Sequence, residues 1–174
     1  MGREQTERER ELETFHPDSF GWALTCCRFD RDEAEEVLQA SYLKAIDGRA
    51  RFNGHSSMRT WFFGVVKRTA AEQRRRRVVR DVALLRWWRK RPAGRPVPTP
   101  EGLSDEAETR KRIKDLLSRL STRQRELLHL VFYQEVTIEE AAGILQIAVG
   151  TARRHYERGK QRLRTLLAKQ GVPR

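Results

Sequence analysis

Four of the six prolines in this 174-residue chain lie between Pro92 and Pro100. A proline ring removes a backbone N–H and clashes with the preceding helical turn, so no helix continues through such a segment. Together with Gly94 and Gly102, these prolines are typical of an extended linker. The chain is therefore predicted to fold as two units, one on each side of a flexible Pro/Arg-rich linker at residues 78–104.

Composition favours two modest units over one large core, because only 38% of the residues are hydrophobic and 34% are charged. The net charge of +12 lies in two blocks: residues 74–91 hold nine basic side chains against one acidic, and residues 150–164 hold six against one. Lys and Arg bind phosphates with release of counterions. Two localised basic surfaces therefore predict a polyanion as partner.

Apolar residues before the linker recur at spacings of three and four, which predicts amphipathic helices. One helix is expected to start at Asp32-Glu33 and to end before Gly48. Another follows Ser56 or Ser57, either of which can cap it. The expected buried stripes are Ala34, Val37, Leu38, Ser41, Ala45 and Ile46, then Met58, Trp61, Phe62, Val65, Val66, Thr69 and Ala70.

Residues 105–170, after the linker, are also expected to be helical, which makes the fold class all-α. Ser121 and Thr137 are predicted to cap two of these helices. A short helix after Thr137, a turn, and a long helix from Val149 to about Ala168 predict a helix-turn-helix. The expected apolar faces are Leu127, Leu128, Val131 and Phe132, then Ile138, Ala141, Ala142 and Leu145, and finally Val149, Ala152, Tyr156 and Leu163.

The remaining features narrow the function class. Residues 1–14 are charged and are expected to form a tail or a loose helix extension, which leaves 15–77 as the first unit. Cys26 and Cys27 cannot build a tetrahedral zinc site alone and are predicted to be buried free thiols. No metal-ligand cluster or nucleophile–base pairing is present, so neither catalysis nor a cofactor is expected. No apolar run of 18 residues occurs, so we expect no membrane insertion and a cytoplasmic location.

The long final helix places Thr151, Arg154, His155 and Arg158 on one stripe, with Arg153 beside it. A charged stripe is usually a solvated helix face. This one is basic only, begins at a helix N-terminus and follows a short helix. In such modules the early residues of the second helix reach base edges in the major groove. We therefore expect these five residues to contact DNA.

Two stretches resemble bacterial RNA polymerase sigma factors of the sigma-70 family. Region 4 is similar to "LSRLSTRQRELLHLVFYQEVTIEEAAGILQIAVGTARRHYERGKQRLRTLL", in which "VGTARRHYERGKQRL" matches the recognition helix. Region 2 is similar to "DEAEEVLQASYLKAI" followed by "RFNGHSSMRTWFFGVVKRTAAEQRRRR". Region 4 alone is shared with LuxR-type regulators. The two regions in this order, with only a linker between them, are the layout of extracytoplasmic-function (group IV) sigma factors.

The resemblance implies roles for particular residues and partners. The helix-turn-helix would read the −35 promoter element and pack on the β-flap of core polymerase. The helix carrying Glu35, Glu36 and Gln39 would dock on the β′ clamp helices. Many members of the family are held inactive by an anti-sigma factor, although nothing in this chain identifies one. The residues implied in −10 recognition and melting are Phe52, Asn53, His55, Ser56, Trp61, Lys67 and Arg68.

The polar loop before Trp61 suits this role physically. Extruding a base from a duplex costs a few kcal/mol in lost stacking and pairing. A polar loop can offer hydrogen bonds to the edges of that base. Phe52 and His55 are better placed as base contacts, whereas Trp61 and Phe62 are expected to lie in the core and to brace the loop.

The chain departs from the family pattern at several positions. Arg68 stands where many members have asparagine, and the linker, often acidic, is basic here; its "WWRKRP" segment has no assigned role. The alternative function is a stand-alone helix-turn-helix regulator, which would need neither a melting loop nor a clamp-docking helix. An enzyme acting on nucleic acid finds least support. The other departures are Ala40, Gln146, Ala148 and His155.

Overall fold

The computed structural model describes residues 10–88 and 105–169, which form helices connected by short loops and contain no strand. No helix in these ranges is long and apolar enough to span a membrane. The all-α prediction is confirmed. The named elements are α2 (His16–Cys26), α3 (Arg31–Ile46), α4 (Met58–Trp88), α5 (Asp105–Ser118), α6 (Thr122–Leu128), the π-helical turn η1 (His129–Tyr133), α7 (Ile138–Leu145) and α8 (Val149–Ala168).

Helix α4 is the central element of the first unit and packs against α2, α3 and α7. Its predicted stripe is buried apart from Trp61, which is half-buried. Phe63 is buried as well, because Trp22 of α2 packs beside it and donates from its indole Nε1 to the Phe63 carbonyl oxygen at 2.9 Å. A helix covered on more than one side needs more apolar residues than one stripe provides.

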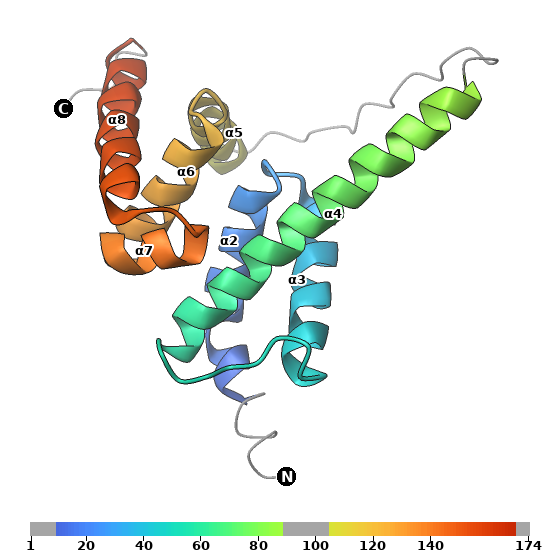
Figure 1. Ribbon diagram of the computed structural model, residues 1–174. Helices are drawn as coiled ribbons and strands as arrows, with labels where there is room; N and C mark the ends of the chain where they lie inside the picture. The colour runs from blue at the N-terminus through green and yellow to red at the C-terminus, as the bar shows by residue number, and fades with distance from the viewer. Residues whose placement is uncertain (1–9, 89–104, 170–174) are drawn as a thin grey trace.

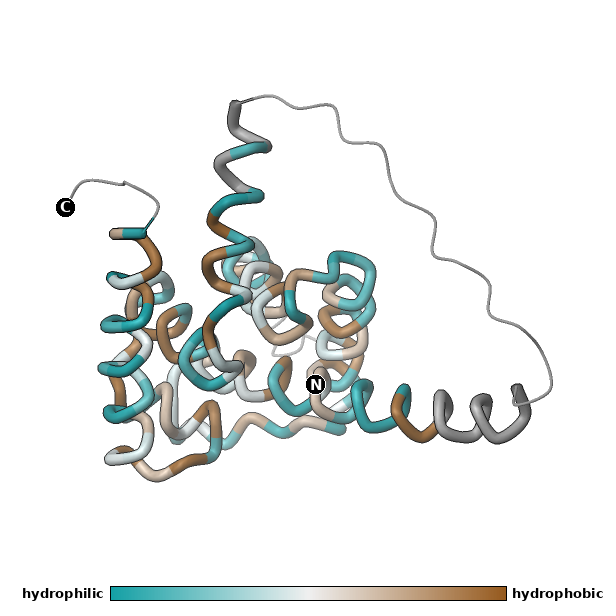
Figure 2. The backbone as a smooth tube through the Cα atoms, turned by 90° about the horizontal axis from the view of Figure 1, so that it is seen from above, coloured by the Kyte–Doolittle hydropathy of each residue, from teal (hydrophilic) through white to brown (hydrophobic). Residues whose placement is uncertain are grey.

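Helix α3 follows its predicted pattern closely. The Asp30 side chain caps it by accepting a hydrogen bond from the Glu33 backbone N–H at 2.9 Å, and Gly48 lies just past its end at φ +71°. The expected stripe is buried except at Ile46, the last helical residue, which is exposed. Along the helices, hydrophobic residues are interspersed among hydrophilic ones, as amphipathic stripes require (Figure 2).

Two boundaries differ from the sequence-based expectation. Residues 10–14 are helical, and Leu12 is only 2% exposed, so this part of the expected tail belongs to the fold. Leu12 joins the core cluster that also contains Phe15 and Phe62. At the other end, α4 continues to Trp88, beyond residue 77 where the linker was expected to begin. Residues 89–104, which hold most of the predicted linker, lie outside the described ranges.

The second unit begins its helices with the predicted caps. Ser121 and Gln124 form a capping box on α6, and Thr137 and Glu140 form another on α7. These reciprocal bonds satisfy backbone N–H groups that have no partner within the helix. The bounds of α8 agree with the prediction.

The π-helical turn explains why one predicted core residue is exposed. Phe132 was expected on the apolar face after Leu128, yet it is 79% exposed, whereas Leu130 is buried. A π-type turn contains an extra residue and rotates the side chains that follow it. Val149 was also expected in the core, but it lies at the first position of α8 and is exposed.

The two units pack against each other rather than standing apart. Helix α4 contacts α7, and α2 contacts both α6 and η1. A single cluster of buried apolar side chains spans the contact. Its members include Trp22, Phe62 and Phe63 from the first unit and Leu127, Leu130 and Ala141 from the second.

Candidate nucleic-acid interface

The start of α8 presents the basic side chains predicted to read duplex DNA. Arg153, Arg154 and Arg158 are exposed, and Thr151 and His155 are half-buried. The opposite side of α8 is closed against α6. A Cβ atom on the buried Gly159 would approach the Gln124 Cβ and a Leu128 methyl group to 3.3 Å. The close approach of the two helices therefore favours glycine at position 159 and turns the arginines outward.

The turn before α8 uses residues that fit it poorly. Gln146 adopts the left-handed conformation at φ +54° and ψ +49°, which glycine adopts at lower cost. Ala148 occupies the N-cap position and makes no side-chain hydrogen bond. An exposed ion pair of 3.5 Å between Arg153 Nη2 and Glu139 Oε1 connects α8 to α7. Gln146 and Ala148, two of the departures from the family pattern noted in the sequence, thus occupy the left-handed position of the turn and the N-cap of α8.

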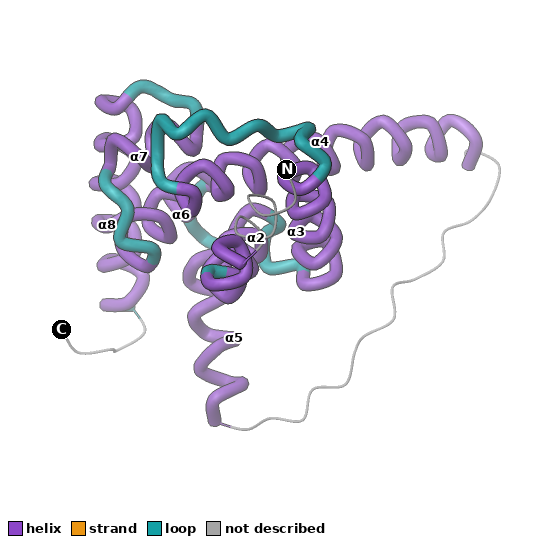
Figure 3. The backbone as a smooth tube through the Cα atoms, turned by 90° about the horizontal axis from the view of Figure 1, so that it is seen from below, coloured by secondary structure: helices purple, strands orange, loops and turns teal. Residues whose placement is uncertain are grey.

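The connection between α3 and α4 is a loop (Figure 3), and most of its polar side chains are exposed to solvent. Asn53, His55 and Ser56 are exposed, and Phe52 is half-buried. Gly54 has φ +74°, where a side chain would be strained. The Asn53 Oδ1 atom accepts from the His55 backbone N–H at 3.3 Å. These contacts fold the loop into a tight turn with its polar edges outward.

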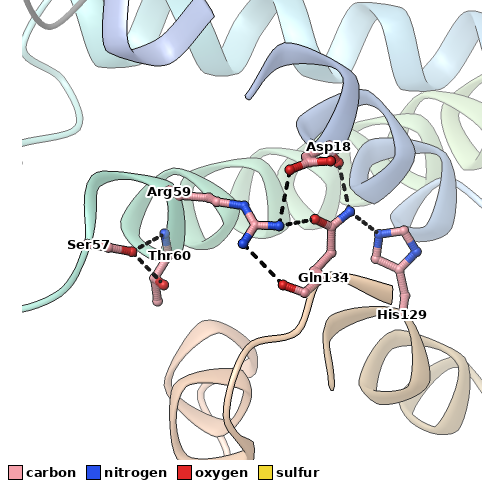
Figure 4. A network of polar contacts seen from close by, with 6 residues as sticks. All are labelled: Asp18, Ser57, Arg59, Thr60, His129 and Gln134. Atoms are coloured by element: carbon pink, nitrogen blue, oxygen red, sulfur yellow. Dashed lines mark hydrogen bonds and ion pairs between the residues drawn. The ribbon is translucent and has the colours of Figure 1, made fainter. Parts of the chain in front are cut away.

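Trp61 braces this loop from α4. Its indole Nε1 donates to the Arg51 carbonyl oxygen at 3.1 Å, and its ring meets Phe52 edge-on at 5.4 Å between centroids. Of the two serines considered as caps, Ser57 caps α4, because its Oγ accepts from the Thr60 N–H at 3.1 Å (Figure 4). Phe62 is fully buried, as predicted. Loop and helix start are thus held in a fixed relationship.

A basic hollow of about 720 Å³ lies beside the loop. Arg68 lines it, together with Arg75 and Arg76 of the basic block predicted at residues 74–91 and with basic side chains of α3 and the loop that were not singled out from the sequence. Glu72 is the acidic member; its pKa is lowered, first by a hydrogen bond from Lys44. Such a hollow suits a phosphate backbone. Its basic residues are Lys44, Arg49, Arg51, Arg68, Arg75 and Arg76.

Lys67 does not line this hollow, although it was predicted to act with Arg68. Successive helical residues point about 100° apart. The Lys67 side chain is 13% exposed, and its Nζ forms an ion pair with Glu126 Oε1 of α6. Glu126 is itself fully buried. The structure therefore places Lys67 in the contact between the two units.

The three residues expected to dock on core polymerase separate into two groups. Glu35 and Gln39 line a hollow of about 560 Å³ on α3. Glu36 instead pairs with Arg77 of α4 at 3.3 Å. The same hollow contains apolar side chains that were not expected to take part in docking. The signal available in the sequence was Leu43, an apolar residue off the predicted buried stripe, which is 54% exposed. These apolar members are Phe20, Leu38, Tyr42 and Leu43.

The cysteines play no part in these surfaces. Cys26 and Cys27 are free and buried, as predicted. Burial raises the pKa of the Cys26 thiol and raises the pKa of Cys27 to about 12. Thiols of such high pKa are poor nucleophiles. Among the described residues, no cluster of three or more His, Cys, Asp or Glu side chains could hold a metal ion.

Both parts of the chain match known protein families. The family described as Sigma-70 region 2 matches residues 12–80, and the family described as Sigma-70, region 4 matches residues 110–163. The probable RNA polymerase sigma-C factor of Mycobacterium bovis is 27% identical over 148 residues, which cover 82% of this chain and 74% of that protein. The ECF RNA polymerase sigma factor SigX of Bacillus subtilis is 24% identical over 154 residues, covering 87% and 79%.

Solved structures agree with the sequence matches. The sigma factor RpoE of Bartonella quintana has a TM-score of 0.70 at 26% identity, covering 92% of this chain and 96% of that one. CnrH shares the fold, with a TM-score of 0.67 at 18% identity, covering 95% and 90%. A stand-alone helix-turn-helix regulator is not favoured, because region 2 matches as well as region 4. The chain therefore belongs to the sigma-70 family of RNA polymerase sigma factors, which are transcription initiation factors, as an extracytoplasmic-function member.

Proposed function

We propose that this sigma factor divides promoter recognition among three of its surfaces. The exposed start of α8 reads the −35 element, the loop at residues 51–57 and the basic hollow hold the opened −10 strand, and the hollow on α3 docks on core polymerase. The polymerase works in the cytoplasm, and this is where the protein is expected to act.

The observation that carries the −10 assignment is the braced loop beside the basic hollow. Asn53 and His55 are exposed on a turn that Trp61 holds by a 3.1 Å hydrogen bond. A preorganised loop loses little conformational freedom when it receives an unpaired base. Arg68 and its basic neighbours supply the contacts that track the phosphates of a single strand. The free energy for strand opening then comes from tighter binding of the single strand than of the duplex.

The α3 hollow supports docking on another protein. Apolar Phe20, Leu38 and Leu43 line it together with charged Arg31 and Glu35. Interfaces commonly combine an apolar centre with a polar rim. We assign the β′ clamp helices as its partner. The second unit would in addition pack on the β-flap, with α8 left free for DNA.

An anti-sigma factor is a further candidate partner. The RpoE structure is a complex with the anti-sigma factor NepR, and the CnrH structure is a complex with the cytosolic domain of CnrY. By analogy, an inhibitor of this chain would cover its polymerase-docking surfaces. Its identity would have to come from a binding experiment.

Transcription in vitro tests the proposal. Core polymerase with this protein should start RNA synthesis at defined sites on its own genome, and sequencing the RNA 5′ ends would map the promoters. Permanganate should detect unpaired thymines just upstream of each start. Core polymerase alone is the control. If no start site depends on the added protein, the proposed function is wrong.

A further inference from the structure

Asn53 is the only asparagine in the chain, and Gly54 follows it directly. Both residues are exposed in the loop between α3 and α4. The side-chain amide of an asparagine can be attacked by the backbone nitrogen of the next residue. Glycine at that position favours the attack, because no side chain crowds the approach. The one asparagine of the chain therefore lies in the most reactive sequence context, within the loop assigned to the −10 element.

The loop holds the two reacting groups next to each other. Asn53 Oδ1 accepts a hydrogen bond from the His55 backbone N–H at 3.3 Å. This contact is an Asx-turn, in which the side chain folds back along its own main chain. The ring that the bond closes contains both Asn53 Cγ, which is the atom to be attacked, and the Gly54 nitrogen, which is the nucleophile. Much of the entropic cost of bringing these atoms together is thus already met in the folded loop.

The Gly54 nitrogen is unobstructed. Its N–H has no hydrogen-bond acceptor among the described residues. A Cβ atom built at this position would meet nothing within 4 Å beyond its chain neighbours, so the space around the peptide is open. Water therefore reaches the N–H and can take its proton.

The surroundings of the loop also favour the attack electrostatically. Negative charge develops first on the Gly54 nitrogen, as it loses its proton, and then on Asn53 Oδ1. The His55 N–H already points at Oδ1, as a donor of an oxyanion hole does. Arg49 and Arg51, which precede the turn, line the basic hollow beside the loop. Positive charge nearby favours a developing anion.

We propose that Asn53 is a site of spontaneous modification, which limits how long this sigma factor stays active. The Gly54 nitrogen gives its proton to water and forms a bond to Asn53 Cγ. The bond between Cγ and Nδ2 then breaks, and Nδ2 takes up a proton from water and leaves as ammonia. The product is a cyclic imide, a succinimide, that spans the two residues.

Water then opens the imide at one of its two carbonyl carbons. Breaking the bond between the Gly54 nitrogen and Cγ leaves an aspartate at position 53. Breaking the bond between the same nitrogen and the main-chain carbonyl carbon leaves an isoaspartate, whose main chain runs through the former side chain. By either route the chain gains one water and loses one ammonia, and neither an oxidant nor a cofactor is needed.

The modification changes the loop where it meets DNA, a consequence that rests on the proposed function. An amide both donates and accepts hydrogen bonds, whereas a carboxylate only accepts them. The new negative charge also opposes the phosphates that the basic hollow attracts. An isoaspartate in addition lengthens the main chain inside the turn. Strand opening therefore declines as the protein ages.

Mass spectrometry of the full-length chain, incubated at physiological temperature and pH, tests the modification. Trypsin cuts after Arg51 and Arg59, so Asn53 falls in one short peptide, whose mass rises by the difference between OH and NH₂. Hydroxylamine cleaves the chain between residues 53 and 54 wherever the imide is present. The matched control is Asn53→Gln, which keeps the amide but would have to close a larger ring that forms more slowly.

A synthetic peptide of residues 51–59 gives the rate without the fold. The folded chain should convert faster than this peptide or within about threefold of its rate, while Asn53→Gln stays unchanged. A lower rate in the folded chain would mean that the loop protects Asn53, and the proposal would be overturned. This readout does not depend on transcription, so its failure is distinct from a failure of the proposed function.

The loss of activity is measured by permanganate reactivity with core polymerase, each protein being compared with its own fresh sample. Opening by the wild type should fall in proportion to the modified fraction, whereas opening by Asn53→Gln should not decline with age. Full opening by extensively modified protein would overturn the effect on activity. If the fresh double substitution Asn53→Ala with His55→Ala also opened promoters normally, the proposed role of the loop would be wrong as well.

Discussion

Trp61 and Arg51 are joined by a hydrogen bond of 3.1 Å from the indole Nε1 to the backbone carbonyl oxygen, across the loop that carries Asn53 and His55. The bond ties the beginning of the loop to the helix that follows it. The loop therefore keeps its shape without a bound base. Its polar residues are expected to act in strand opening rather than in the first contact with duplex DNA.

Trp61→Phe should separate these two steps. Phenylalanine keeps an aromatic ring against Phe52 but cannot donate to Arg51, so the loop loses its brace. We expect open-complex formation, measured by permanganate reactivity, to fall several-fold while closed-complex binding stays near the wild-type level. The double substitution Asn53→Ala with His55→Ala should act in the same direction without disturbing the brace. A larger loss in closed-complex binding than in opening would contradict the role of the loop.

Arg154→Ala tests the recognition helix. Arg154 is exposed near the start of α8 and forms none of the described salt bridges. If it reads a base edge, its loss should weaken binding of the −35 duplex by about 1–3 kcal/mol and relax preference at one position. Arg164→Ala, near the far end of the same helix, controls for the lost charge. An equal loss on all duplex sequences would assign Arg154 to a phosphate instead.

Ala148→Ser should stabilise the second unit. The residue has extended backbone geometry at φ −64° and ψ 143° and leaves the first turn of α8 without a side-chain cap. A serine hydroxyl there can accept from an N–H of that turn, a contact worth roughly 0.5–2 kcal/mol. Chemical denaturation would measure the gain in the free energy of unfolding. Ala148→Val cannot cap and should show no gain.

Leu43→Glu tests the docking surface on α3. Leu43 is 54% exposed and lines the hollow that also contains Glu35 and Gln39. A carboxylate at this position would have to be desolvated in the complex, so affinity for core polymerase should fall by more than tenfold. Ile46→Glu places the same charge on an exposed apolar residue of the same helix that does not line the hollow. Equal losses in both variants would argue against this hollow as the docking site.

Local signals account for the parts of the fold that the sequence predicted. The caps at Ser121 and Thr137 and the bounds of α8 depend on residues within one or two turns. The polar loop and its brace could also be inferred, because Trp61 lies close to the loop in sequence. Free thiols at Cys26 and Cys27 could be predicted because two neighbouring cysteines alone cannot build a tetrahedral zinc site.

Long-range packing accounts for what the sequence could not predict. Phe132 is turned outward by a single π-type turn, which leaves no mark in the apolar spacing. Helical spacing already turns Lys67 away from its neighbour Arg68, but its ion pair with Glu126, 59 residues away in the sequence, depends on how α4 and α6 meet. Leu12 is buried because it packs into the core cluster that also contains Phe15 and Phe62. Contacts of this kind depend on how helices meet, and periodicity along one helix does not contain that information.

His129 makes the contact between the units sensitive to pH. Gln134 donates to His129 Nε2 at 3.2 Å, and the amide is oriented by Arg59, which donates to its oxygen. The Nδ1 atom lies 3.0 Å from Thr25 Oγ1 of α2. Nε2 must therefore accept, which requires a neutral imidazole. Burial, and then the charge of Arg59, lowers the pKa of His129 from its ordinary 6.5 to about 4.

The contact between the two units should consequently weaken in mild acid. The contact is most stable above pH ~6.5, where His129 is neutral whether the units are packed together or apart. It weakens as the pH falls towards 4, because His129 takes up a proton when the units are apart and excludes it when they are packed. The loss is about 1.4 kcal/mol per pH unit in this window. Scattering at pH 7.5 and pH ~5.5 should show the wild type expanding, and His129→Gln should remove the change. If the wild type kept the same radius of gyration down to pH ~5, the assignment of His129 as a pH-sensitive contact would be wrong.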